Sequence, residues 1–162
     1  MGRLLTVYIP VIAAAIVANI GLPLQGSLIA VAAGLFLWTL LEYGIHRFAF
    51  HGFLPHYQHH EDPKDPKYIA SPLWLSGGTS LLLWALMRIP AGSWARSSLT
   101  QAAIISGYLF YEWLHLRIHA NEAGGPLLTE LRKRHYYHHF ADERFHYGVT
   151  TNVWDRVFRS LP

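Results

Sequence analysis

The sequence predicts an all-α integral membrane protein with four transmembrane helices and a cytoplasmic, histidine-rich helical cap. Only 14% of the 162 residues are charged, against about 25% in an average soluble domain, and 52% are apolar. The apolar residues are concentrated in four runs, at Leu4–Ile20, Ser27–Ile45, Pro72–Ile89 and Leu99–Ile118. So little polar surface does not suit a soluble globule, and the length fits one domain over residues 1–162.

Each run is long enough to cross a bilayer. About 17 to 20 helical residues rise about 30 Å, which is the thickness of the hydrocarbon core. The segment Gly21-Leu-Pro23 separates the first two helices, and Pro90 and Gly92 separate the last two. Arg3 precedes the first run as in a signal peptide, but no cleavage site of small residues precedes a hydrophilic segment. We therefore expect the first run to be an anchor.

The basic residues predict the orientation in the membrane. If the N-terminus is cytoplasmic, four spans leave only Arg88 and Arg96 on the far side, and the other eleven Lys and Arg residues are cytoplasmic. This is the positive-inside distribution of membrane proteins. It places both termini and the histidine-rich segments in the cytoplasm. It also explains the net charge of +3 without a nucleic acid partner, because the basic residues form no stripe with interleaved aromatics.

Ten of the eleven histidines form two blocks of similar spacing. The first contains His46, His51, His56, His59 and His60, and the second contains His115, His119, His135, His138 and His139. Each block follows an apolar run and ends in the pattern His-x2-His-His. Imidazoles at this density predict nitrogen-ligated metals. Because the chain has no cysteine, thiolate sites and iron–sulfur clusters held by this chain are excluded.

The spacing within the blocks predicts two metal ions. On an α-helix, positions four apart differ by about 40°, so His115 and His119 share a face. Adjacent positions diverge by about 100°, so His138 and His139 suit different ions. We therefore expect each short histidine helix to serve both metals. Two octahedral ions offer about twelve positions, and ten imidazoles would leave about one open on each.

The interval between His46 and His51 does not suit an ideal helix, where the two side chains would differ by about 140°. We expect the helix to end or to overwind between them, and Gly52 favours an end. Three residues outside the blocks are candidates for supporting roles. Glu112 shares a face with His115 and could orient an imidazole, bind metal or form a buried structural hydrogen bond. His146 could support the site, face the substrate or be exposed, and Asp155 could cap a short helix or support the site.

These motifs resemble the fatty acid hydroxylase and sterol desaturase superfamily of histidine-rich membrane di-iron oxidases, over about Trp38 to Phe158. The resemblance rests on four motifs: Glu42-Tyr-Gly-Ile-His46-Arg-Phe-Ala-Phe-His51-Gly, Leu54-Pro-His56-Tyr-Gln-His59-His60, His115-Leu-Arg-Ile-His119 and His135-Tyr-Tyr-His138-His139-Phe. The segment from His146 to Phe158 is similar to the one that follows the last histidine box of fatty acid 2-hydroxylases.

The resemblance implies a reaction and its components. The ten histidines of the two blocks would be ligands of two iron ions, although zinc could occupy the site in purified protein. The family reaction inserts one oxygen atom of O2 into an unactivated C–H bond of a lipid, with two electrons from an external donor. Eukaryotic relatives carry a fused haem domain, which this chain has no room for. We therefore expect a separate ferredoxin or cytochrome with its reductase as the electron donor.

Other readings of the same motifs remain open. Carotenoid ring hydroxylases and sterol desaturases or methyl oxidases share the histidine boxes of the superfamily. From a different class, the chain could be a histidine-rich membrane metal carrier. A carrier is expected to place its ligands near the bilayer midplane, whereas these histidines follow the ends of apolar runs.

Overall fold

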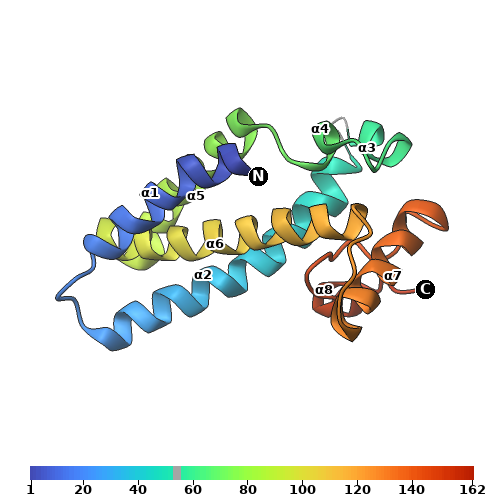
Figure 1. Ribbon diagram of the computed structural model, residues 1–162. Coiled ribbons are helices and arrows are strands. Elements are labelled where there is room, and N and C mark those ends of the chain that lie inside the picture. The colour runs from blue at the N-terminus through green and yellow to red at the C-terminus, as the bar shows by residue number, and fades with distance from the viewer. Residues whose placement is uncertain (53–55) are drawn as a thin grey trace. The chain divides into compact units, whose positions relative to one another are not determined.

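The computed structural model describes residues 1–52 and 56–162, and it contains helices and loops but no strand in those residues. The elements in chain order are α1 (Gly2–Val17), α2 (Leu24–Gly44), the π-helix η1 (Ile45–Phe50), α3 (Tyr57–Glu61), α4 (Pro66–Ile69), α5 (Leu73–Ala91), α6 (Trp94–His119), α7 (Pro126–Phe140) and α8 (Val153–Val157) (Figure 1). The predicted all-α fold class is confirmed.

The chain forms two compact units. Unit 1 comprises Met1–Trp38 and Ser71–Phe110, and unit 2 comprises Thr39–Ala70 and Tyr111–Pro162. The division falls inside the two long helices α2 and α6. All 10 acidic residues and all 11 histidines belong to unit 2. Unit 1 is therefore an apolar helical unit, and the chemically active side chains are confined to unit 2.

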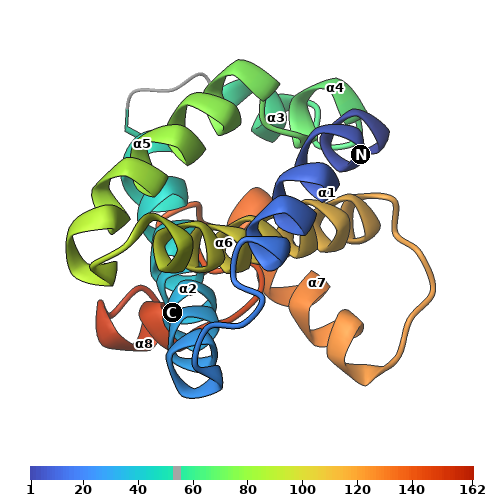
Figure 2. The ribbon, with the colours of Figure 1, turned by 90° about the vertical axis from the view of Figure 1, so that its left-hand side faces the viewer.

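α6 is the buried helix of unit 1, and Figure 2 shows α1, α2 and α5 around it. The ring of Tyr108 on α6 lies 5.9 Å from that of Tyr8 on α1 and 5.7 Å from that of Trp38 on α2. On the α5 side, Trp84 Nε1 donates a hydrogen bond of 2.9 Å to Ser98 Oγ. Because three helices cover α6, its polar and small side chains are shielded from the surroundings of the unit.

Two helical stretches are long and apolar enough to cross a membrane, Leu24–Phe50 and Lys67–Ala91. α1 is apolar but has only 16 residues, and α6 has 26 residues of more polar composition. All four predicted apolar runs are thus helical, while length and composition indicate a span at two of them. Most of the exposed large apolar side chains among the described residues belong to unit 1, as expected of a surface that contacts lipid.

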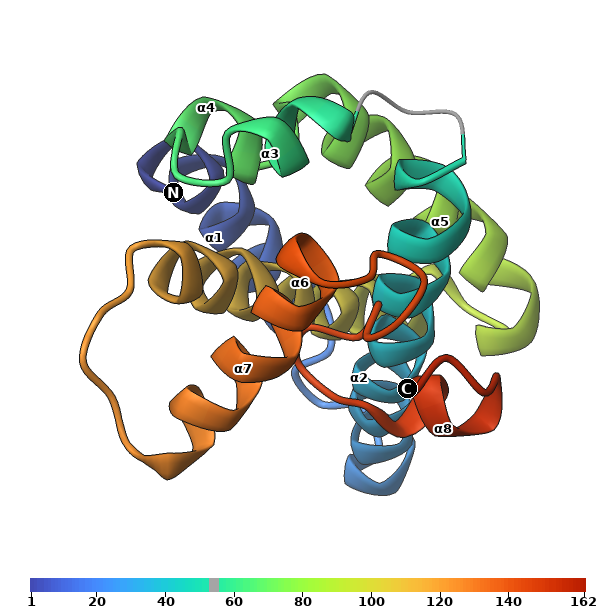
Figure 3. The ribbon, with the colours of Figure 1, turned by 90° about the vertical axis from the view of Figure 1, so that its right-hand side faces the viewer.

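Unit 2 is built from short helices, the ends of α2 and α6, and connecting loops. The loop over residues 141–152 joins α7 to α8 and is called here the C-terminal loop. Figure 3 shows this loop folded back toward the end of α2. Two hydrogen bonds tie the following residues to α2. Trp154 Nε1 donates to Thr39 Oγ1 over 3.0 Å, and the hydroxyls of Tyr43 and Ser160 lie 2.9 Å apart. The C-terminus of the sequence is therefore part of the same unit as the end of α2.

The helix ends at Phe50, with His51 at its C-cap, so the predicted end between His46 and His51 is confirmed. The alternative, overwinding, is wrong, because the last turn is underwound instead. The π-helix η1 lies between them, and the amide of His51 donates to the carbonyl of His46 over 3.3 Å. A hydrogen bond between residues five positions apart places His51 over His46, which brings the two ring centroids to 5.1 Å. Gly52 follows because a Cβ there would collide with the carbonyl of Phe48.

Candidate metal centre

The histidines of the two sequence blocks meet in unit 2 in two groups. The five-histidine group contains His59, His115, His119, His135 and His139, and the four-histidine group contains His46, His51, His56 and His60. Within each group, one ring nitrogen of every member lies within 4.8 Å of the others. The tenth histidine of the blocks, His138, lies beside the four-histidine group, with its Nε2 3.0 Å from His51 Nε2.

The five-histidine group has the geometry of a shared cation. Five of the ten pairs of Nε2 atoms in the group are separated by 2.8 Å to 3.2 Å. Two imidazole nitrogens bound at right angles to one ion at about 2.1 Å are about 3.0 Å apart. His135 Nε2 contacts three other Nε2 atoms, of His115, His119 and His139. One ring nitrogen offers a single hydrogen or a single lone pair, so hydrogen bonds alone cannot satisfy this arrangement.

The four-histidine group also presents unpartnered nitrogens. The Nε2 atoms of His46, His56 and His60 are buried and make no hydrogen bond within the described part of the chain. Buried polar atoms without partners are uncommon in proteins, and a bound ion is one accepted explanation. The donor set is nitrogen only, which suits iron or zinc and not magnesium or calcium. Both groups therefore fit the predicted metals.

Adjacent histidines separate as the helical spacing predicts. His59 belongs to the five-histidine group and His60 to the four-histidine group. His139 likewise belongs to the five-histidine group, while His138 lies beside the other. The five-histidine group thus includes His59 from the first block, and His138 from the second block lies beside the four-histidine group. Each of the two helices α3 and α7 therefore presents histidines to both sides of the candidate centre.

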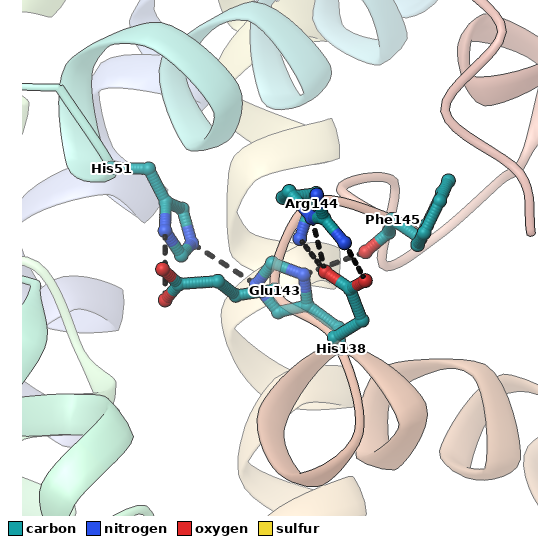
Figure 4. A network of polar contacts seen from close by, with 6 residues as sticks. His51, His138, Glu143, Arg144 and Phe145 are labelled. Carbon is teal, nitrogen blue, oxygen red and sulfur yellow. Dashed lines mark hydrogen bonds and ion pairs between the residues drawn. The ribbon is translucent and has the colours of Figure 1, made fainter.

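Backbone carbonyls orient two of the imidazoles. His46 Nδ1 lies 2.6 Å from the carbonyl oxygen of Tyr147, and His138 Nδ1 lies 2.7 Å from that of Phe145. A carbonyl oxygen only accepts, so each Nδ1 carries the hydrogen and each Nε2 presents a lone pair. Figure 4 shows His138 with Phe145 and, nearby, His51 Nδ1 facing Glu143 Oε2 at 3.7 Å. The tautomers that Nε2 ligation requires are therefore set by the protein at His46 and His138.

Burial keeps the imidazoles neutral. It lowers the pKa of His56 to about 2 and that of His59 to about 3, and repulsion from neighbouring histidines adds to the effect. Burial also lowers the pKa of His138 to about 3, although its hydrogen bond to the Phe145 carbonyl raises that pKa. A neutral imidazole is the form that binds a metal. Both groups are therefore ready to bind at physiological pH.

Asp155 does not cap a helix. The side chain at the N-cap of α8, Asn152, makes no capping hydrogen bond. Asp155 is fully buried and accepts hydrogen bonds from the amides of Tyr147 and Gly148, at 2.9 Å and 3.0 Å. The helix-cap alternative for Asp155 is therefore wrong, and the carboxylate instead holds the C-terminal loop.

Glu42 performs the same task from α2, and sequence reasoning did not single it out. It is 4% exposed, and its Oε1 accepts hydrogen bonds of 2.7 Å from the amides of both Val149 and Thr150. The Thr150 hydroxyl donates to the other carboxylate oxygen. The available signal was a carboxylate in an apolar helix, one turn before His46. Such a group needs several hydrogen-bond donors when it is buried.

The two remaining candidates lie outside both histidine groups. His146 is in the C-terminal loop with a left-handed backbone, φ 57°, and its amide donates to the carbonyl of Ser160 over 3.0 Å. Glu112 is fully buried on α6, one turn before His115. Metal binding or imidazole orientation by Glu112 stays a prediction, as does a substrate-facing role for His146.

The arrangement defines a class of helical proteins in which two groups of histidines converge near the ends of apolar helices. The sequence matches the family described as fatty acid hydroxylase over residues 31–160. It is 32% identical over 170 residues to a dihydroceramide fatty acyl 2-hydroxylase of Arabidopsis thaliana, covering 97% of this chain and 71% of that protein. The chain therefore belongs to the fatty acid hydroxylase family, as the motifs indicated.

Two further similarities extend this result. The chain is 32% identical over 143 residues to a ceramide very long chain fatty acid hydroxylase of Saccharomyces cerevisiae, covering 77% of this chain and 36% of that protein. Its structure is similar to that of full-length scs7p, of which only the hydroxylase domain is visible. The TM-score is 0.84 and the identity 27%, over 98% of this chain and 65% of that one. The chain thus spans about a third to two thirds of the lengths of these two proteins.

Proposed function

We propose that this protein is a membrane di-iron monooxygenase that hydroxylates a C–H bond in the fatty acyl chain of a lipid. The observation that carries the proposal is the convergence of Nε2 atoms in the five-histidine group, since three-way nitrogen contacts near 3 Å fit a shared cation and not a set of hydrogen bonds. The family supplies the reaction class. The name of the Arabidopsis thaliana relative, a dihydroceramide fatty acyl 2-hydroxylase, favours position 2 of the acyl chain.

The ligand set of the proposal is the ten histidines of the two blocks. The five-histidine group would hold one iron ion, and the four-histidine group with His138 would hold the other. When bound, the two irons would activate O2 with two electrons from an external donor and so supply the oxidising power for C–H hydroxylation. The protein's own contribution is to keep the imidazoles neutral, to fix their tautomers through Tyr147 and Phe145, and to hold them in place.

The setting of the site is proposed to be the cytoplasmic face of a membrane. The proposal is four spans at α1, α2, α5 and α6, with both termini and the histidines in the cytoplasm. The positive-inside distribution of Lys and Arg supports this orientation, and the exposed apolar surface of unit 1 supports contact with lipid. A separate ferredoxin or cytochrome with its reductase would deliver the electrons.

The proposal is tested by isotope labelling. Purified iron-loaded protein is given a fatty acyl lipid panel, a reductase with ferredoxin, and labelled O2. We expect one labelled oxygen atom in a hydroxylated acyl product, and we expect replacement of His119 or His135 by Ala to abolish it. If no oxygenated or desaturated product forms, while the same variants change metal accumulation in cells, the chain is a metal carrier instead.

A further inference from the structure

We infer that the C-terminal loop supports one of the two metal positions and not the other, and that Glu42 and Asp155 are the positioning residues that fix it. The inference rests on the proposed function, because it requires both histidine groups to bind metal. The loop contacts imidazoles on one side of the centre and not on the other, and two buried carboxylates hold it in place. One of these carboxylates is connected to an imidazole through a peptide group.

The loop contacts imidazoles of one metal position only. Three of its residues, within a stretch of five, face Nδ1 atoms of His46, His51 and His138. The contacts are Tyr147 carbonyl to His46 at 2.6 Å, Phe145 carbonyl to His138 at 2.7 Å, and Glu143 carboxylate to His51 at 3.7 Å. These three imidazoles belong to the four-histidine group or lie beside it. The loop therefore supports this side of the centre.

The five-histidine group lacks that support. The Nδ1 atoms of His59, His115, His135 and His139 are buried and make no hydrogen bond to any of the described residues. An imidazole whose second nitrogen is unbonded has a less fixed orientation and is a weaker base toward a metal. The two metal positions are therefore chemically unequal, although both consist of histidines.

Two buried carboxylates hold the loop through four consecutive amides. Asp155 accepts from the amides of Tyr147 and Gly148, and Glu42 accepts from those of Val149 and Thr150. Hydrogen bonds to a carboxylate are about twice as strong as neutral ones. The amide of Tyr147 lies between the Phe145 and Tyr147 carbonyls that meet the imidazoles, and the amide of Gly148 shares a peptide group with the Tyr147 carbonyl. The position of those carbonyls is thus set by Glu42 and Asp155.

Asp155 also has an electrostatic effect on His46. The amide of Gly148 and the carbonyl of Tyr147 belong to one peptide group. That group donates to Asp155 Oδ2 over 3.0 Å and accepts from His46 Nδ1 over 2.6 Å. A negative charge on the amide side polarises the peptide, and the carbonyl oxygen becomes a stronger acceptor. Asp155, the Tyr147–Gly148 peptide group and His46 therefore act together as a carboxylate–histidine pair with a peptide group between its members. This arrangement raises the basicity of His46 Nε2.

The test measures metal release from the full-length, metal-loaded protein in detergent. An excess of chelator is added, and the rate at which each ion leaves is followed together with the total metal content. The variants are Glu42→Gln and Asp155→Asn, with Glu130→Gln on α7 as the matched control. Glu130 is an exposed carboxylate that pairs with Arg134 on the same helix, at 3.6 Å. His51→Ala identifies the release phase that belongs to the four-histidine group.

In the wild-type protein we expect two ions and two release phases. Glu42→Gln and Asp155→Asn should each accelerate the phase identified by His51→Ala about tenfold or more and leave the other phase within about twofold. Hydrogen-bonding support of metal ligands affects metal affinity about 10- to 100-fold. Glu130→Gln should change neither phase. Should Glu42→Gln fail to fold, Thr150→Val removes only the hydroxyl bond to that carboxylate and should accelerate the same phase less.

The outcomes separate the inference from the proposed function. Equal acceleration of both phases would show that the loop maintains only the fold, and unchanged phases would show that it does not support the ligands. Either result overturns the inference and leaves the two-metal proposal intact. A wild-type protein with fewer than two ions would instead contradict the proposed function and the inference together.

Discussion

His138 and His139 are neighbours in the chain, yet their ring planes are nearly perpendicular, at 87°, and they belong to different sides of the centre. His139 Nε2 lies 3.1 Å from His135 in the five-histidine group, whereas His138 Nε2 lies 3.0 Å from His51. The helical offset of about 100° between adjacent residues explains this division. One turn of α7 therefore presents histidines to both sides of the candidate centre.

This division predicts that the two histidines are not equivalent. We expect His138→Ala to weaken the ion of the four-histidine group and His139→Ala to weaken that of the five-histidine group. Each loss should leave the second ion bound with less than about a tenfold change, because one imidazole serves one ion. Metal content after graded dialysis against chelator measures the effect. Identical release profiles for the two variants would argue that both imidazoles serve one site.

The π-helix predicts an unusual sensitivity at Gly52. A Cβ at this position would meet the carbonyl of Phe48, so Gly52→Ala must distort the turn that brings His46 and His51 together. We expect a loss of about 1 to 3 kcal/mol in the free energy of unfolding and a lower Tm. Gly77→Ala in α5 is the control. Nothing lies within 4 Å of a Cβ there, and alanine in a helix should stabilise by about 0.5 to 1 kcal/mol. A Tm at least as high for Gly52→Ala as for Gly77→Ala would count against this account of the turn.

The proposed topology predicts which residues a reagent can reach from the cytoplasm. The chain has no cysteine, so single replacements give unambiguous labelling. We expect Lys64→Cys and Arg134→Cys to react from the same side as Arg3→Cys, and Ser93→Cys to react only from the opposite side. Accessibility of a membrane-impermeant thiol reagent in oriented vesicles measures this. Labelling of Ser93→Cys from the cytoplasmic side would overturn the four-span arrangement.

The nitrogen-only ligand set predicts that purified protein can contain zinc. Imidazole sites bind zinc well, and zinc has no redox cycle. We expect a zinc-loaded preparation to be folded but inactive, and activity to return after zinc is removed and iron is supplied under reducing conditions. Metal analysis and product formation should be followed on the same sample. Full activity in a preparation that contains zinc and no iron would exclude iron as the working metal.

Much of the candidate site could be predicted from the sequence, because helical geometry converts spacing into direction. The convergence of His115 with His119 and the separation of His59 from His60 followed from the helical offsets between these residues. The helix over Ile45–Phe50 could not be predicted, since a five-residue interval fits either a helix end or a π turn. The choice depends on tertiary contacts that the local sequence does not contain.

The hydrogen-bond partners of the imidazoles and of the C-terminal loop could not be predicted from the sequence, for a different reason. The carbonyls of Phe145 and Tyr147 belong to the backbone, and every residue has one, so no residue type marks them. Glu42 accepts hydrogen bonds from amides 107 and 108 residues later in the chain, and no local pattern relates such distant positions.

For the fold, the four helical runs were evident from composition. The covering of α6 by three other helices depends on contacts such as Trp84 with Ser98, which composition does not specify.

The central claim is that ten histidines from both blocks of the sequence hold two metal ions. An experimental structure of the iron-loaded protein, with anomalous scattering measured at the iron edge, tests it most directly. We expect two iron peaks. One should be surrounded by His59, His115, His119, His135 and His139, and the other by His46, His51, His56, His60 and His138. A single peak, or two irons each bound by only one sequence block, would contradict the claim.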